Sequence, residues 1–167
     1  MSCNQQIRLL LCFVFVAGLL CPCNGQKKDS LPKPIGYVND FEKIFSAREV
    51  KYLDSLIADF DHKTSNQFAV ITVDTSMVSK GDFENYILKI ARSWGVGMKG
   101  KDNGIVIGFS RGYRKIRIAN GNGIEKIISD AETKTVLDSV IIPFFKKNQY
   151  FEGTVQGLKA MMDRLKK

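Results

Sequence analysis

Two apolar segments, residues 67–73 and residues 104–109, place the strongest constraint on how this 167-residue chain can fold. Both are rich in β-branched residues and are apolar at nearly every position, a pattern typical of strands buried on both faces of a sheet. The amphipathic stretch between them begins after Asp82, which we expect to be its N-cap, and stops at Gly95. A buried strand, a crossover helix and a second buried strand predict a right-handed parallel unit.

The rest of the chain predicts further helices and one antiparallel strand. Residues 113–119 alternate between apolar and basic side chains after a Ser-Arg-Gly turn, which predicts a half-exposed strand paired with residues 104–109. Ser46 and Ser129 are each followed by a glutamate three residues later, so both predict a capping box at a helix start. Pro143 is expected to bend or end the second of these helices. We therefore expect an α/β/α sandwich, with a small mixed sheet and helices on both faces.

The N-terminus has the organisation of a secretory signal peptide. Arg8 precedes an apolar run over residues 9–20, which is too short to span a membrane, and small residues follow up to Gly25. We place cleavage after Gly25, so the protein is expected to be secreted or periplasmic. A lipoprotein signal ending at Cys21 or Cys23 is the alternative, although neither cysteine follows the small residue that such a signal prefers.

Cleavage at this point divides the chain into a signal peptide at 1–25, a polar linker at 26–36 and one folded domain at 37–167. The removed part contains all four cysteines: Cys3, Cys12, Cys21 and Cys23. The mature protein is then expected to have no disulfide and no cysteine nucleophile. Because no membrane-spanning segment follows the domain, we expect a soluble protein, and we expect it to be a monomer.

The chain is basic, with a formal net charge of +8 that falls to +7 without Arg8. Such a charge favours anionic partners, for example phosphorylated groups, acidic polymers or a membrane surface, although it is also common on a solvated surface. No nucleic-acid-binding motif is present, so we do not expect a nucleic-acid partner for an exported protein of this kind.

Three polar motifs are predicted to meet at one edge of the sheet. Lys-Asp-Asn-Gly, with Asp102 and Asn103, opens the second buried strand, and the hairpin returns Asn-Gly-Asn-Gly, residues 120–123, beside it. Ser-Asp-Ala follows, with Asp130. Asp74 is expected at the opposite edge, and the same reasoning does not place Asp40.

Carboxylate, amide and backbone oxygens at this edge suit Ca²⁺ or Mg²⁺ better than Zn²⁺, which prefers histidine and cysteine. The glycines around a helix start, Gly121 and Gly123 with Asn122 between them, could also hold a phosphate on backbone amides. A plain turn is the alternative interpretation of that segment. The only histidine, His62, is expected at a helix end away from this edge, so no Ser-His-Asp site is predicted.

These motifs, taken in order, resemble the TPM domain over roughly residues 37–162. The resembling pieces are Val-Asn-Asp at 38–40, Trp-Gly-Val-Gly at 94–97, Gly-Lys-Asp-Asn-Gly at 100–104, Gly-Asn-Gly-Ile-Glu at 121–125 and Ser-Asp-Ala at 129–131. The resemblance implies an exported α/β/α sandwich that binds a divalent metal, with acid phosphatase activity in thylakoid-lumen members. Other members are implied to act in photosystem repair or as accessory subunits of receptors.

The resemblance also implies a site. The acidic positions of the family fall on Asp40, Asp102 and Asp130, with Asn103 beside them, and these four residues are the predicted metal ligands. Asp102 and Asp130 are the candidate catalytic residues. One departure bears on this site, because Gly-Asn-Gly stands where the family often has Gly-Tyr-Gly, which adds an oxygen ligand at Asn122.

Two functions follow as hypotheses. In the first, the domain binds Ca²⁺ or Mg²⁺ and is a metal-assisted phosphomonoesterase, with one carboxylate as the base. In the second, the same ion is structural and the domain is a non-catalytic accessory or maintenance module for membrane-protein partners in the envelope.

Overall fold

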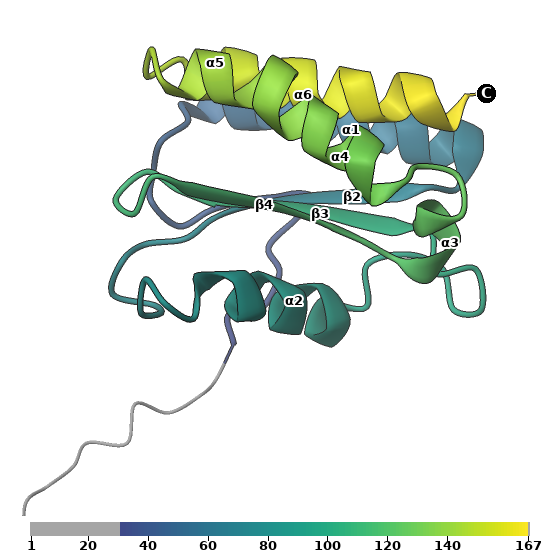
Figure 1. The fold of residues 1–167 in the computed structure, drawn as a ribbon, viewed down its shortest axis with the longest axis horizontal. Helices are drawn as coiled ribbons and strands as arrows, with labels where there is room; N and C mark the ends of the chain where they lie inside the picture. Colours follow the sequence, from purple (N-terminus) through teal and green to yellow (C-terminus); the bar gives the residue numbers. More distant parts are fainter. Residues whose placement is uncertain (1–30, 167) are drawn as a thin grey trace, which may run out of the picture. The chain divides into compact units, whose positions relative to one another are not determined.

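The computed structural model describes residues 31–166, so the predicted signal peptide, its cleavage site and the first part of the linker lie outside the described residues. A four-stranded sheet in the order β1-β2-β3-β4 forms the middle layer (Figure 1). Its strands are β1 (Val38–Asp40), β2 (Gln67–Thr72), β3 (Gly104–Ser110) and β4 (Lys115–Asn120). The helices are α1 (Ala47–Thr64), α2 (Phe83–Trp94), α3 (Asn122–Glu125), α4 (Asp130–Thr135), the π-helix η1 (Val136–Ile141), α5 (Ile142–Phe145) and α6 (Tyr150–Leu165).

The pairing of the strands confirms the predicted topology. β2 and β3 are parallel and joined through α2, and β4 returns antiparallel to β3. β1 is a further parallel strand beside β2, in a segment where no strand was predicted from the sequence. All three parallel strands therefore end at the same edge of the sheet, and β4 begins there.

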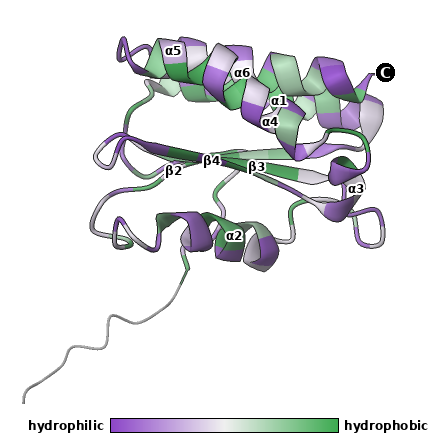
Figure 2. Ribbon diagram, in the orientation of Figure 1, coloured by the Kyte–Doolittle hydropathy of each residue, from purple (hydrophilic) through white to green (hydrophobic). Residues whose placement is uncertain are grey.

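Helices cover both faces of the sheet, which confirms the α/β/α sandwich. Helices α1 and α4 to α6 lie on one face and α2 lies on the other (Figure 1), and apolar residues concentrate along the strands between these layers (Figure 2). Within β2, Phe68 and Val70 belong to the core on the α1 and α6 side, whereas Ala69 and Ile71 belong to the core on the α2 side. Burial on both faces thus explains why residues 68–71, in the middle of this strand, are all apolar.

The helix ends confirm most of the expected caps. Ser46 and Ser129 each form the predicted capping box. Gly95 ends α2 in the left-handed conformation, with a φ of 63°. Asp82 is the N-cap residue of α2, as predicted, but its side chain makes no capping hydrogen bond. Its own backbone is helical, and its carboxylate accepts a 2.6 Å hydrogen bond from the Ser79 hydroxyl instead.

Pro143 does not end its helix. The chain stays helical from α4 through η1 into α5, where Pro143 lies in the first turn. Proline has no amide hydrogen to donate to the preceding turn, and the wider π turn comes directly before it. Among residues 31–166, none of the helices combines the length and the apolarity that a membrane crossing requires.

Candidate functional site

The loop that joins α2 to β3 is held against the sheet by two amide side chains. Asn103 is buried, its Oδ1 accepts a 2.8 Å hydrogen bond from the Met98 amide, and its Nδ2 donates to the Ser65 carbonyl. The side chain of Gln67, at the start of β2, accepts a 2.9 Å hydrogen bond from the Gly97 amide. Both polar atoms of the Asn103 side chain are thus engaged in fixing the loop, although the sequence predicted this residue as a metal ligand.

Glycines allow the two glycine-rich segments to touch through their backbones. A Cβ on Gly104 would overlap the Val96 carbonyl, and a Cβ on Gly121 or Gly123 would overlap the carbonyls of residues 101–102. The Gly121 amide donates to the Gly104 carbonyl at 2.8 Å, and the Gly123 amide donates to the Asp102 carbonyl at 3.0 Å. These two amides, which were predicted to cradle a phosphate, are therefore already used within the chain.

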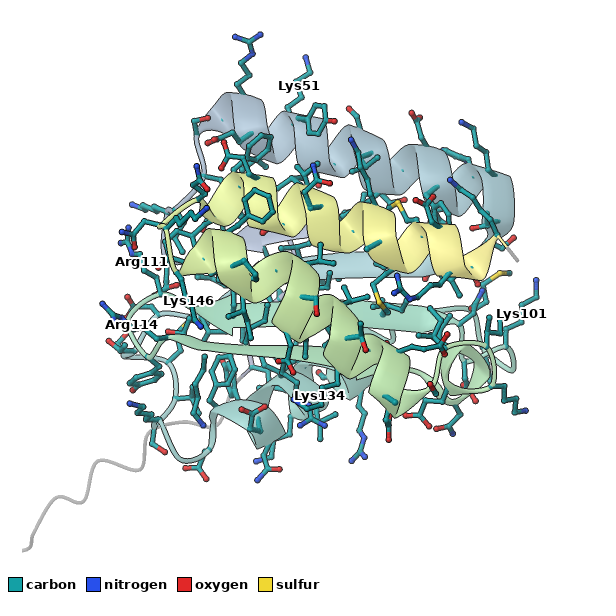
Figure 3. All side chains as sticks on the ribbon, turned by 45° about the horizontal axis from the view of Figure 1, so that its top comes forward. Lys51, Lys101, Arg111, Arg114, Lys134 and Lys146 are labelled. Carbon is teal, nitrogen blue, oxygen red and sulfur yellow. The ribbon has the colours of Figure 1, made fainter. Side chains whose placement is uncertain are left out.

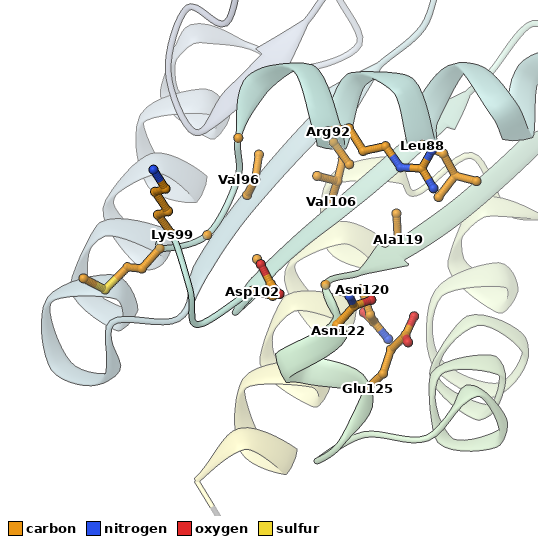
Figure 4. A pocket seen from close by; sticks show the side chains of 16 residues that line it. Leu88, Arg92, Val96, Lys99, Asp102, Val106, Ala119, Asn120, Asn122 and Glu125 are labelled. Atoms are coloured by element: carbon orange, nitrogen blue, oxygen red, sulfur yellow. The ribbon is translucent and has the colours of Figure 1, made fainter.

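A pocket of about 560 Å³ opens beside this backbone contact, and we call it the loop pocket (Figure 4). Its apolar wall comes from α2 and from the facing strands β3 and β4, through Leu88, Val106 and Ala119. The loop 95–102 and the start of α3 complete its rim. The volume is within the range of small-molecule sites in proteins.

Four oxygen-bearing side chains line the loop pocket: Asp102, Asn120, Asn122 and Glu125 (Figure 4). Asp102 is exposed and has a left-handed backbone with a φ of 50°. Within residues 31–166, the carboxylates of Asp102 and Glu125 have no hydrogen-bonding or ionic partner. The Asn120 Nδ2 donates to the Thr133 hydroxyl at 2.8 Å, but its buried Oδ1 accepts no hydrogen bond from the described part of the chain.

The same pocket also carries positive charge. Arg92, from the last turn of α2, and Lys99, from the loop, both line it. Neither forms a salt bridge with any described residue, so the two cations do not neutralise the pocket carboxylates directly. The loop pocket thus presents unpaired charges of both signs to whatever enters it.

Asp130 lies next to this pocket. It is the first residue of α4, it is exposed, and it lines an adjoining depression of about 280 Å³. Asn120 and Glu125 line both cavities and therefore lie between Asp102 and Asp130. The structure thus brings the two candidate catalytic residues to the same edge of the sheet, as the topology predicted.

Asp40 lies at the other end of the sheet. It pairs with Thr72, which pairs in turn with Phe109, whereas Asp102 precedes Gly104 at the start of β3. At about 3.3 Å per residue, positions 104 and 109 alone are roughly 17 Å apart, which is beyond the reach of one coordination shell. The structure therefore does not bring Asp40 together with Asp102, Asn103 and Asp130. Asp74, which follows β2, lies at the Asp40 end as expected.

Across residues 31–166, no group of three or more His, Cys, Asp or Glu side chains is placed to hold one metal ion. The loop pocket offers two carboxylates together with amide oxygens, a mixed set of hard oxygen donors of the kind that Ca²⁺ and Mg²⁺ accept. Divalent-cation binding at this edge accordingly remains a prediction.

Comparison with known proteins establishes the family. The TPM domain family model matches residues 38–164, which is most of the chain. The chain belongs to the TPM domain family. No curated protein is similar enough to this TPM domain to count as a match.

Solved structures share the fold of this TPM domain. The N-terminal domain of a protein from P. gingivalis is 26% identical, with a TM-score of 0.69 over 77% of this chain and 81% of that one. The BA42 protein from Bizionia argentinensis is 22% identical, with a TM-score of 0.64 over 75% of this chain and 83% of that one. The N-terminal domain of cg2496 from Corynebacterium glutamicum is 13% identical, with a TM-score of 0.60 over 80% and 82% of the two chains.

Several pocket residues of this TPM domain were not predicted from the sequence. Glu125 follows the Gly-Asn-Gly segment closely, and the short helix α3 brings it to the pocket. Arg92 and Leu88 are four residues apart on α2, so helical spacing puts them on one stripe beside the buried face. That spacing, combined with the predicted crossover, is the signal that could have identified Arg92.

Proposed function

We propose that this TPM domain binds a divalent cation, Ca²⁺ or Mg²⁺, in the loop pocket and acts there as a phosphomonoesterase. The observation that carries the proposal is a group of oxygen atoms around one cavity that have no partner among the described residues: the solvent-exposed carboxylates of Asp102 and Glu125 and the buried Oδ1 of Asn120. A buried carbonyl oxygen without a donor is costly unless something outside the chain satisfies it. A hard cation would do so, and Asn122 is placed on the same wall to add an oxygen.

The hard oxygen donors of these residues suit such an ion. Asp102 and Glu125 would hold it, with the amide oxygens of Asn120 and Asn122, and Asp130 would be the nearest further carboxylate. A bound divalent cation supplies Lewis acidity toward a phosphoryl oxygen and lowers the pKa of a bound water. Its binding would also favour the left-handed conformation of Asp102, an arrangement that costs free energy in the unbound chain.

The charges of the pocket support a phosphomonoester as the substrate. Arg92 and Lys99 would bind the phosphoryl oxygens, because both cations line the pocket without an ion pair among the described residues. A carboxylate that is not occupied by the ion, from Glu125 or Asp130, would accept the proton of the attacking water. The apolar wall of Leu88, Val106 and Ala119 would face the organic part of the ester.

Thermal unfolding of the purified protein tests the cation site. After treatment with EDTA, addition of CaCl₂ or MgCl₂ should raise the midpoint by several degrees, because an ion at 100 times its Kd stabilises the folded state by about 2.7 kcal/mol. Asp102→Asn and Glu125→Gln should lose this rise, and Asp59→Asn, which changes an exposed carboxylate on α1, should keep it. A rise that persists in both pocket variants would contradict the proposal.

Hydrolysis of p-nitrophenyl phosphate tests the reaction. The wild type should turn over only with the ion that shifts its midpoint, and Arg92→Gln should raise KM without removing the midpoint shift. Cation binding without turnover would instead support the second candidate, a non-catalytic accessory module for membrane-protein partners. The second candidate is favoured by the residues that line the loop pocket, which include no histidine or cysteine.

A further inference from the structure

A cluster of exposed cations lies at the end of the sheet opposite the loop pocket. We call it the basic end and define it by five residues on three turns: Lys43, Arg111, Arg114, Lys146 and Lys147. Figure 3 shows Arg111, Arg114 and Lys146 close together at one side of the domain, with Lys101 at the opposite side. All five side chains are exposed, and none forms a salt bridge with another described residue.

Contacts between the turns hold these cations in one place. The carboxylate of Glu42, next to Lys43, accepts hydrogen bonds from the Arg111 amide at 2.8 Å and from the Gly112 amide at 3.1 Å. The turn between α5 and α6 is fixed by Tyr150, whose ring stacks on Phe109 of β3 with 6.1 Å between centroids. The three turns therefore form one surface although they are far apart in the sequence.

The cations of these turns are exposed to solvent, whereas the carboxylates of the turns are hydrogen-bonded to the backbone. Lys43 and Arg114 both have a φ of 52°, so each lies in a tight left-handed turn at the tip of its loop. Three carboxylates of the same end, from Asp40, Glu42 and Asp74, accept hydrogen bonds from backbone amides. Glu49 and Glu152 are set back on the first turns of α1 and α6, and Glu49 is engaged by Ser46 in its capping box.

From this arrangement we propose that the basic end binds the surface of a bilayer that contains anionic phospholipid. The five cations come from separate turns, and the hollows beside them also contain carboxylates. A depression of about 270 Å³ is lined by Arg111, Glu49 and Glu152, and one of about 470 Å³ is lined by Lys43, Asp40 and Asp54. A chain-like polyanion would need cations spaced continuously along one groove. A bilayer offers many phosphates in one plane, so cations on separate turns can each contact a phosphate without a fixed spacing between them. Attraction to such a surface acts within about 8–10 Å, so cations at loop tips are the ones that reach it.

Sedimentation with lipid vesicles tests this inference. The protein should bind vesicles of phosphatidylcholine mixed with phosphatidylglycerol, should not bind phosphatidylcholine alone, and should be released by NaCl. The basic-end variant carries five substitutions, with asparagine at the left-handed positions: Lys43→Asn, Arg111→Gln, Arg114→Asn, Lys146→Gln and Lys147→Gln. The control removes the same charge from exposed lysines elsewhere: Lys63→Gln, Lys89→Gln, Lys101→Gln, Lys126→Gln and Lys159→Gln.

The basic-end variant should bind the anionic vesicles at least about tenfold more weakly than wild type, and the control should lose less than about threefold. Equal losses in the two variants would overturn the proposal, because net charge alone would then explain binding. Binding of soluble polyphosphate without binding of vesicles would overturn it as well. The double variant Lys146→Gln with Lys147→Gln, which leaves the left-handed turns intact, should show a partial loss if the larger variant does not fold.

Discussion

The hydroxyl of Thr72 donates a 2.6 Å hydrogen bond to Oδ1 of Asp40, across the parallel pair β1 and β2. The same carboxylate accepts hydrogen bonds from the amides of Ile44 at 3.0 Å and Phe45 at 2.7 Å. Asp40 thus closes the turn that leads from β1 into α1. An aspartate that was predicted to be a metal ligand thus has a local structural role, remote from the loop pocket.

Replacing Asp40 should therefore affect stability and leave cation binding intact. Asp40→Ala removes the acceptor for two amides and one hydroxyl, so we expect a loss of about 3 kcal/mol in the free energy of unfolding. Urea unfolding measures this loss, and a metal titration of the folded variant should still show the midpoint rise. Asp102→Ala, in contrast, should lose the midpoint rise and little intrinsic stability. If folded Asp40→Ala no longer responds to Ca²⁺ or Mg²⁺, the two ends of the sheet are coupled.

Gly104→Ala should be severely destabilising. The added methyl group would overlap the backbone carbonyl of Val96, which cannot move without opening the loop. We expect a cost of about 3 kcal/mol or more, measured by chemical unfolding. Gly81→Ala is the matched control, because Gly81 is exposed and nothing crowds its Cβ position, so it should change stability by less than about 0.5 kcal/mol. Similar losses in the two variants would argue against the close backbone contact.

The close packing of α2 against β3 leads to a second prediction. A Cβ on Gly108 would overlap the side chain of Ile87, so Gly108→Ala should cost about 1–3 kcal/mol. Ile87→Val removes the terminal methyl group that lies nearest to this position. In the double variant, the two substitutions should therefore be coupled favourably by about 1 kcal/mol. A double-mutant cycle of unfolding free energies measures the coupling, and additive losses would refute it.

Asp54 should make stability depend on pH in a direction opposite to that of most carboxylates. Burial raises the pKa of Asp54 above its ordinary value of 3.8, and a 3.0 Å hydrogen bond from the Val38 amide only partly opposes this. The folded protein then holds the Asp54 proton more tightly than the unfolded chain does. The contribution of Asp54 to the free energy of unfolding therefore falls as pH rises from 3.8 through the raised pKa. At neutral pH the ionised Asp54 carboxylate still lowers the stability of the folded protein.

Asp54→Asn keeps an acceptor for the Val38 amide and removes the charge. The variant should be more stable than wild type at neutral pH, and the difference should shrink as pH falls through the raised pKa and be gone below 3.8. Urea unfolding across this range measures the effect, and Asp59→Asn on the same helix is the exposed control. An advantage of Asp54→Asn that stays constant with pH would show that the charge of Asp54 is not its cause.

The central part of the fold was predictable because burial on two faces leaves a strong signal. Alternate residues of β2 belong to two different cores, so the four positions between Gln67 and Thr72 had to be apolar, and the crossover followed from the helix between β2 and β3. β1 was not predicted, since it has only three residues. One of these, Asn39, is buried and uses its side chain to bond the Ile35 amide and the Gly36 carbonyl.

The site was predictable only at the level of topology. Parallel strands and a hairpin bring Asp102, Asp130 and the segment 120–123 to one edge, whatever their side chains do. The direction of the Asn103 side chain depends on Ser65, which is remote in the sequence, and no local pattern carries that information. The same holds for Glu125, which reaches the loop pocket because of how the short helix α3 is placed.

The shape of the loop pocket and its chemistry depend on different atoms. The shape is set by the backbone contact between the loop before β3 and the segment after β4. Its framework is made by main-chain atoms and glycines, whereas Lys99, Asn122 and Glu125 are exposed side chains attached to that framework. Substitutions at these three positions would change the charge and the polarity of the pocket without disturbing its walls. Selection could therefore give this scaffold a different ligand through a few surface mutations, while changes at Gly104 or Gly121 would be disfavoured because they destabilise the fold.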